Sequence, residues 1–139
     1  MKDDSKKAIS IRTGKLRQSV KVGSHEIVVD EPRSQGGDDD GPEPQELLAA
    51  SLASCTAITM EMYAERKGWD IGDVEVSCSY QPAERGTPTR FDLVLRIPEH
   101  VPPAQVDKLK VIAAECPVHR TLDGEVMFTE RVETAQLTA

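Results

Sequence analysis

Aromatic side chains are scarce in this sequence of 139 residues, where Phe, Tyr and Trp together make up 4%. Aliphatic and small side chains must therefore fill the core. Basic residues are outnumbered as well, with 17 Lys and Arg against 24 Asp and Glu and a formal net charge of −7. Proteins that bind nucleic acids or anionic membrane surfaces rely on clustered Lys and Arg. The charge balance therefore argues against both kinds of partner.

The sequence also has little that would direct it out of the cytoplasm. No apolar stretch follows the charged residues 1–7, and no run of 18 apolar residues occurs, so we expect neither a signal peptide nor a membrane span. Three cysteines are an odd number, which does not suit a complete disulfide framework. We therefore expect a cytoplasmic protein whose thiols are reduced.

Length and composition predict one domain over residues 1–139. Apolar residues make up 38% and charged residues 29%, which is typical of a globular chain. Short alternating segments around turn residues predict an N-terminal β-meander over 8–12, 16–22 and 26–29. A loop rich in Gly, Pro and Asp follows over 30–44, and we expect it to be mobile.

Residues 44–67 contain no helix breaker and predict one long helix. Pro44 suits its first turn, and Gly68 suits its C-terminus. Nearly every side chain over 47–55 is apolar or small, which is typical of a helix buried on all sides. Such a helix spans about 33 Å, more than a chain this short can cover alone. We therefore expect a dimer.

The second half of the chain predicts further antiparallel strands and a second helix. Residues 73–81 and 90–97 alternate and are expected to pair with each other. A helix is expected between the proline pair 102–103 and residues 116–117, and a last strand over 126–132. The elements together predict an α+β fold.

Two of the three cysteines are candidates for chemistry. Cys55 lies in the middle of the long helix, where it is either a small core side chain or a nucleophile. A nucleophilic thiol needs a nearby cation or hydrogen-bond donors to lower its pKa. Cys116 is followed by His119 and Arg120, either of which could reach its thiol, although His119 is equally compatible with a buried or capping histidine. Cys78 faces the apolar side of its strand, so we interpret it as core.

Motifs for metals and phosphates are missing. Cys116 and His119 have the spacing of half a zinc site, but the sequence contains no second such pair. The acidic run 38–40 lacks the alternating spacing of a calcium loop. The glycine pair 36–37 is not followed by the Gly-Lys-Ser/Thr of a phosphate-binding loop. We expect no cofactor and no metal ion.

Two cysteine-containing stretches are the most specific features of the sequence. Residues 41–56 are Gly-Pro-Glu-Pro-Gln-Glu-Leu-Leu-Ala-Ala-Ser-Leu-Ala-Ser-Cys-Thr, and residues 116–122 are Cys-Pro-Val-His-Arg-Thr-Leu. Together with residues 62–68 they resemble the OsmC/Ohr family, and the order of elements matches across essentially the whole chain. The resemblance implies an intertwined α+β homodimer with two long central helices wrapped by sheets from both chains.

The resemblance also implies thiol-dependent reduction of organic hydroperoxides. Cys55 matches the peroxidatic cysteine, whose thiolate would attack the peroxide and become a sulfenic acid. Cys116 matches the resolving cysteine, which would condense with that acid to an intramolecular disulfide, and an external dithiol would reduce it. The apolar helix would line a pocket that favours hydrophobic peroxides over hydrogen peroxide.

The activating glutamate of the family is displaced in this sequence. The family's peroxidases carry it ten residues before the first cysteine, where this chain has Gln45, and Glu46 comes nine residues before Cys55. At 100° per residue, Glu46 lies on the opposite side of its helix from Cys55. It could contact a thiol only through a partner chain or a helix break. The alternative is an acid that favours the helix dipole.

The activating arginine of the family is also not in its usual context, because the Gly-Gly-Arg motif is absent. Arg17 is the candidate that we carry forward, with Arg12 and Arg33 as alternatives. The form of the second cysteine motif also allows His119 or Arg120 to take over the activation.

A second hypothesis belongs to a different functional class. The chain could be a non-peroxidatic relative that binds a small apolar or electrophilic ligand, with Cys55 as a redox sensor or a core residue. A peroxidase needs a lowered pKa of Cys55 and a Cys55–Cys116 disulfide on oxidation, whereas a binding protein needs neither.

Overall fold

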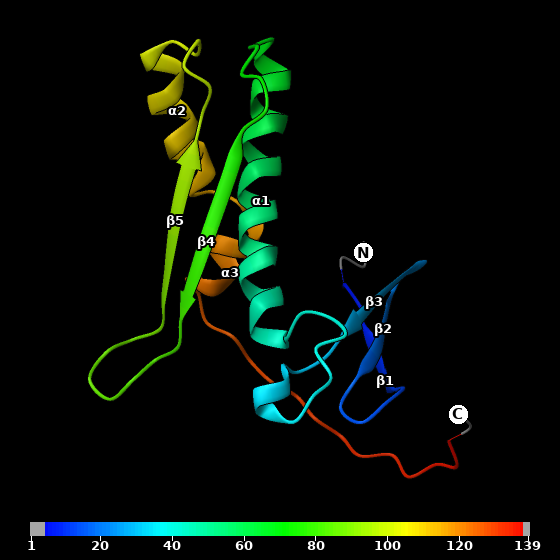
Figure 1. Cartoon of the computed structure of the whole chain (residues 1–139). Helices are drawn as coiled ribbons and strands as arrows, with labels where there is room; N and C mark the ends of the chain where they lie inside the picture. The colour runs from blue at the N-terminus through cyan, green and yellow to red at the C-terminus, as the bar shows by residue number, and fades with distance from the viewer. Residues whose placement is uncertain (1–4, 138–139) are drawn as a thin grey trace.

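A three-stranded antiparallel meander opens the computed structural model, which describes residues 5–137. Its strands are β1 (Ile9–Arg12), β2 (Gln18–Val22) and β3 (His25–Val29), in the order β1-β2-β3. Gly23 has the positive φ, 61°, that the tight turn between β2 and β3 requires. The predicted meander is thereby confirmed, and in Figure 1 it lies beside the N-terminal end of the long helix.

The loop between β3 and the long helix, which we expect from its composition to be mobile, contains a network of hydrogen bonds. It contains one turn of 3₁₀ helix, η1 (Arg33–Gln35). Asp30 is 2% exposed, and its carboxylate accepts the backbone N–H groups of Glu31, Asp38 and Asp40 at 2.8, 3.3 and 3.1 Å. A buried carboxylate with three backbone donors holds both ends of the loop together.

The predicted long helix is α1 (Pro44–Lys67). At its start, the Glu46 carboxylate accepts the backbone N–H of Glu43 at 3.0 Å, so a free donor of the first turn is satisfied. At its end, Gly68 adopts the left-handed conformation, with φ 70°, and its N–H bonds to carbonyls of the last turn. Local capping chemistry therefore sets both helix boundaries.

α1 buries one face within the chain. The buried side chains recur one turn apart along the helix: Leu52, Thr56, Met60 and Ala64. On the other side, Ile58 and Met62 are 52% and 55% exposed. The burial on all sides that we expect with a second subunit is thus not reached within the single chain, where β4, α2 and α3 pack against one side of α1.

Among the described residues, α1 is also the one helix that is long and apolar enough to cross a membrane, judged by length and composition alone. Its most apolar 18 residues have a mean hydropathy of 1.3, and 22% of them are buried in the chain. Its inner face packs against a sheet and two other helices. We therefore interpret it as the core helix of a globular fold.

The second sheet is a hairpin that packs against α1. It consists of β4 (Glu75–Gln81) and β5 (Arg90–Arg96), paired antiparallel. In Figure 1, α2 (Pro103–Ala113) lies near the C-terminal end of α1, at the end of the hairpin where β5 finishes. The buried core between these elements consists of Met60, Ala64, Ile71, Val101, Leu109 and Ala113.

The helix expected up to residues 116–117 is shorter, and a further helix that was not predicted follows it. α2 ends at Ala113, and a separate short helix, α3 (Pro117–Leu122), begins directly after Cys116. Pro117 has no N–H to continue a helix, but it suits the first position of a new one. The chain therefore turns at Cys116, which becomes the residue that caps α3.

The strand expected over 126–132 is not found. After α3, the described residues form no further helix or strand, and Met127, Phe128 and Val132 are 87%, 83% and 91% exposed. An alternating segment becomes a strand only where a neighbouring strand supplies backbone partners. This segment runs along the molecule without such a partner, as Figure 1 shows.

Candidate functional site

Cys55 and Cys116 meet where the middle of α1 contacts the start of α3. Cys55 is half-buried, Cys116 is fully buried, and both are free thiols. The two side chains lie close enough that Cys116 raises the pKa of Cys55. The structure therefore brings together the two cysteines that the resemblance pairs.

Cys116 caps the first turn of α3. Its Sγ accepts the backbone N–H of His119 at 3.3 Å, one of the donors that a helix start leaves without a partner. On its other side, Sγ lies 3.8 Å from the hydroxyl Oγ1 of Thr56. Contacts from α1 and from α3 thus fix the position of this sulfur.

The environment of Cys55 favours the neutral thiol. Burial raises the pKa of Cys55, and the adjacent Cys116 raises this pKa further, while the Val118 backbone and the Thr59 hydroxyl act in the opposite direction. The net shift of the Cys55 pKa is upward. Within the described part of the chain, no cation acts on this thiol.

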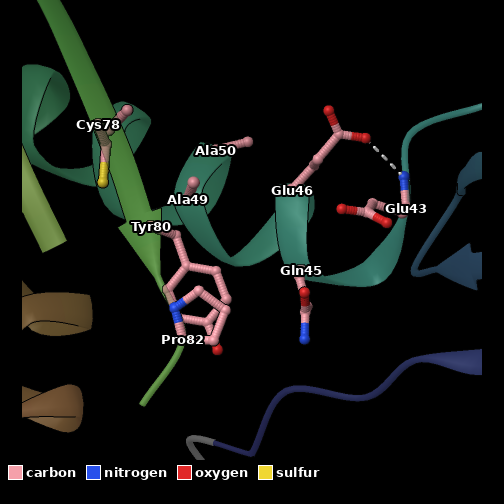
Figure 2. Close-up of a pocket in the computed structure, with 9 residues that line it drawn as sticks. Glu43, Gln45, Glu46, Ala49, Ala50, Cys78, Tyr80 and Pro82 are labelled. Atoms are coloured by element: carbon pink, nitrogen blue, oxygen red, sulfur yellow. Dashed lines mark hydrogen bonds between the residues drawn. The ribbon is translucent and has the colours of Figure 1, made fainter. Parts of the chain in front are cut away.

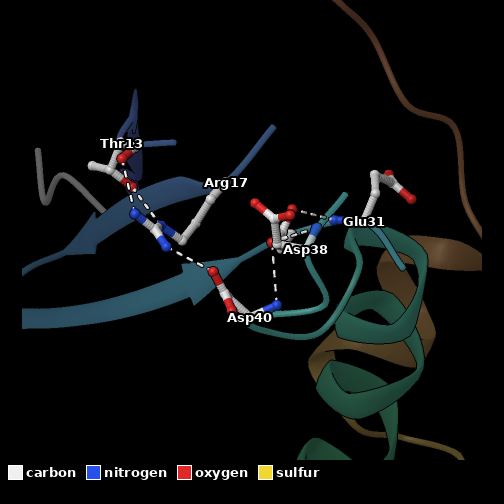
Figure 3. A network of polar contacts seen from close by, with 6 residues as sticks. Thr13, Arg17, Glu31, Asp38 and Asp40 are labelled. Atoms are coloured by element: carbon white, nitrogen blue, oxygen red, sulfur yellow. Dashed lines mark hydrogen bonds and ion pairs between the residues drawn. The ribbon is translucent and has the colours of Figure 1, made fainter. Parts of the chain in front are cut away.

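Arg17 lies in the meander and binds the loop rather than a cysteine. Its guanidinium contacts Asp40 Oδ2 at 2.6 Å and donates to the carbonyl of Thr13 at 2.9 Å. Figure 3 shows Arg17 between Thr13 and Asp40, next to the hydrogen-bond network that includes Glu31 and Asp38. In the single chain, the structure does not bring Arg17 to the thiols.

Glu46 lies at the start of α1, about 13 Å along the axis from Cys55. Figure 2 shows its carboxylate turned toward the backbone N–H of Glu43, the capping contact described above. It lines an open cavity of about 560 Å³ between α1 and β4, into which Cys78 also faces. In the single chain, Glu46 therefore has the capping role and no contact with the thiol pair.

Cys78 is half-buried rather than fully enclosed. It lies on the face of β4 that packs against α1, as its alternation predicts, but it borders the 560 Å³ cavity. Burial and then the nearby charge of Asp92 raise the pKa of Cys78. Cys78 therefore lies at the edge of the hydrophobic core, with its side chain partly exposed.

His119 contacts Cys116 through its backbone N–H and is one of the residues that line two cavities. One cavity has a volume of about 500 Å³ and the other about 190 Å³. Leu93 on β5 lines both. The larger is bordered mainly by apolar and aromatic side chains from α1, β4, β5 and α3: Leu48, Leu52, Tyr80, Phe91, Leu93 and Leu122.

Three residues at the site were not anticipated from the sequence: Thr56, Thr59 and Val118. Thr59 follows Cys55 by four residues, so helical spacing alone places both on one face of α1. Thr59 could therefore have been predicted from its four-residue spacing to Cys55. The contact of Thr56 with Cys116 joins two distant segments, and no local pattern contains it.

The profile of the OsmC-like protein family matches residues 37–131. The match spans both cysteine motifs and more than half of the chain. This protein therefore belongs to the OsmC-like family. No curated protein matches the sequence.

Solved structures share the fold over most of the chain. An organic hydroperoxide resistance protein from Elizabethkingia anophelis is 24% identical, with a TM-score of 0.67 over 88% of this chain and 91% of that one. An OsmC-like protein from Mycoplasma pneumoniae is 19% identical, with a TM-score of 0.71 over 88% and 90%. The organic hydroperoxide resistance protein OhrB of Bacillus subtilis is 20% identical, with a TM-score of 0.59 over 86% and 91%.

Proposed function

We propose that this protein is a cytoplasmic, homodimeric thiol peroxidase that reduces organic hydroperoxides. The contact between the half-buried thiol of Cys55 and the fully buried thiol of Cys116 carries this proposal. A reactive thiol needs access to substrate, and a resolving thiol needs to lie beside it. The fold shared with organic hydroperoxide resistance proteins supports the same function.

In the first step, the Cys55 thiolate attacks one oxygen of the peroxide ROOH. A sulfur–oxygen bond forms and the oxygen–oxygen bond breaks, so the sulfur is oxidised and the peroxide is reduced. The leaving alkoxide takes a proton and departs as the alcohol ROH. Cys55 is left as a sulfenic acid.

In the second step, the sulfur of Cys116 attacks the sulfenic sulfur of Cys55. A disulfide forms, and the sulfenic hydroxyl leaves with the thiol proton as water. An external dithiol then reduces the disulfide by exchange and is itself oxidised. No step requires a cofactor.

The cavities beside His119 support an organic substrate. The 190 Å³ cavity is bordered by Thr56 and His119, the neighbours of Cys116, and otherwise mainly by apolar side chains. An apolar substituent of a peroxide gains free energy by leaving water for such a surface, about 25 cal/mol per Å². Hydrogen peroxide has no such substituent, so we expect the organic peroxide to be preferred.

Activation of Cys55 requires a group that the single chain does not place beside it. The open face of α1, with Ile58 and Met62 exposed, supports association with a second copy. In that dimer, we propose that Arg17 and Glu46 of one copy act on the thiol pair of the other. The guanidinium lowers the pKa of Cys55, the carboxylate orients the guanidinium, and His119 lines the substrate pocket.

The test of this function is the consumption of cumene hydroperoxide with dithiothreitol as reductant. The wild-type protein is expected to turn over many times and to prefer this peroxide to hydrogen peroxide. Cys55→Ser should abolish turnover, and Cys78→Ser, the matched control, should leave it unchanged. Equal turnover by the wild type and Cys55→Ser would reject the proposal.

One observation favours a second candidate function. The raised pKa of Cys55 in the single chain fits a thiol that is not activated. The protein would then bind a small apolar or electrophilic ligand in the cavities beside His119, with Cys55 as a sensor. A wild type that consumes no peroxide, yet binds an apolar fluorescent probe in competition with small apolar ligands, would favour this function.

A further inference from the structure

We propose that Thr56 is a positioning residue for Cys116, which it holds for disulfide formation without taking part in the attack on peroxide. This inference rests on the proposed function. It assigns to Thr56 an effect on the second chemical step alone.

The hydroxyl of Thr56 has a fixed orientation. Thr56 is 2% exposed, and its Oγ1 lies 2.8 Å from the carbonyl oxygen of Leu52, one turn earlier in α1. A carbonyl cannot donate, so the single hydroxyl proton of Thr56 goes to Leu52. The oxygen therefore presents its remaining lone pair to Cys116 Sγ, 3.8 Å away.

The partners of the Cys116 sulfur follow from this orientation. The thiol proton points to the Thr56 oxygen, which can only accept from it. One sulfur lone pair accepts the backbone N–H of His119 at 3.3 Å. The remaining side of the sulfur is available to Cys55, which lies close enough for Cys116 to raise its pKa. Thr56 thus directs the thiol proton of Cys116 away from Cys55, so that a lone pair of the Cys116 sulfur is available to Cys55.

This arrangement suits the resolving step. The sulfenic acid of Cys55 needs a sulfur lone pair directed at it, and its leaving hydroxyl needs one proton. The Cys116 sulfur supplies the lone pair. Its thiol proton is released on the side of Thr56, the leaving hydroxyl takes one proton from solvent, and water departs when the disulfide forms. Without the Thr56 oxygen, the thiol is free to rotate, and its proton can point at Cys55. Misorientation of a reacting group by a small amount costs up to about a hundredfold in rate.

The experiment compares the two steps in single turnover, in the full-length Cys78→Ser protein. Thr56→Val removes the hydroxyl while keeping the shape of the side chain, and Thr56→Ser keeps the hydroxyl. Thr87→Val is the matched control in the exposed loop between β4 and β5. One equivalent of cumene hydroperoxide is added. Dimedone trapping reports sulfenic acid, and mass spectrometry reports the disulfide.

We expect Thr56→Val to form sulfenic acid within about twofold of the parent rate and to form the disulfide at least about tenfold more slowly. Thr56→Ser should restore disulfide formation to within about threefold, and Thr87→Val should change neither step. An unchanged rate of disulfide formation in Thr56→Val overturns the inference. An equal loss in both steps that Thr56→Ser does not restore also overturns it.

A second measurement separates this inference from the proposed function. Oxidised dithiothreitol forms the Cys55–Cys116 disulfide by thiol exchange without peroxide. Thr56→Val should slow this closure at least about tenfold as well, and an unchanged rate overturns the inference. If the parent protein forms no sulfenic acid, the peroxidase proposal fails, while this comparison still decides the role of Thr56.

Discussion

Arg17 Nη1 lies 2.6 Å from Asp40 Oδ2, an ion pair that joins the meander to the loop before α1. Both side chains are substantially exposed, so the pair itself contributes little to stability. The ion pair fixes the orientation of the Arg17 side chain, which remains partly exposed. The Arg17 guanidinium is thus available to a second copy of the chain. Substitution of either Arg17 or Asp40 breaks the ion pair and can be used to test its role.

The first prediction concerns the source of activation. Arg17→Gln removes the cation and should lower the rate of Cys55 oxidation by cumene hydroperoxide about a hundredfold. Asp40→Asn breaks the same ion pair but keeps the cation, so it should lower the rate by less than about threefold. Stopped-flow oxidation of both variants measures the difference. Similar losses in the two variants would mean that Arg17 only holds the loop.

The second prediction concerns the pH dependence of Cys55. The neighbouring Cys116 is one of the groups that raise the pKa of Cys55, so Cys116→Ala should lower that pKa. The midpoint of Cys55 alkylation by iodoacetamide should then move to lower pH than in the parent. Cys78→Ser as the common background confines alkylation to the site. A midpoint that stays in place or rises would contradict the contact between the two thiols.

The third prediction concerns Asp30. Burial raises the pKa of Asp30, but three backbone hydrogen bonds and the charge of Arg17 outweigh it, and the net shift is below the ordinary value of 3.8. The folded state thus gains stability from the ionised carboxylate above the unfolded pKa, about 3.9, and loses it as the pH falls through the folded value.

Asp30→Asn should accordingly lower the free energy of unfolding at pH 7, and the difference from the wild type should shrink as the pH falls below about 4. Urea unfolding between pH 3 and pH 7 measures this difference. Asp39→Asn is the control, because this residue in the same loop is exposed. A difference independent of pH would contradict the assigned role of the charge.

The fourth prediction concerns the dimer. Ile58→Asp puts a charge on the open face of α1, where the side chain is 52% exposed in the single chain. The folded chain should tolerate it, while a second copy would have to bury the charge, at a cost of several kcal/mol. Sedimentation should show a monomer for Ile58→Asp and a dimer for Glu65→Gln, an exposed control on the same helix. A dimer in both would place the interface elsewhere.

Local chemistry predicted α1 well because every boundary signal lies within a few residues of the boundary. Pro44 and Gly68 act on their own helix ends as expected, whereas the capping contact between Glu43 and Glu46 was not predicted. The three strand pairings, β1 with β2, β2 with β3 and β4 with β5, follow for the same reason. The break between α2 and α3 was also available locally, since Pro117 cannot continue a helix.

The candidate site was only partly accessible to sequence reasoning. The family resemblance paired Cys55 with Cys116, but the contact of Thr56 with Cys116 depends on how α3 docks on α1. The strand expected over 126–132 depends on a neighbouring strand that the chain does not place beside it. Information carried by tertiary or intermolecular contacts is absent from local periodicity.

The most direct test of the central claim is a disulfide map after oxidation. The reduced protein is treated with one equivalent of cumene hydroperoxide, alkylated, digested without reductant and analysed by mass spectrometry. The account predicts a single linkage between the peptides of Cys55 and Cys116, with Cys78 alkylated. Recovery of Cys55 and Cys116 as alkylated thiols, or a linkage through Cys78, would contradict it.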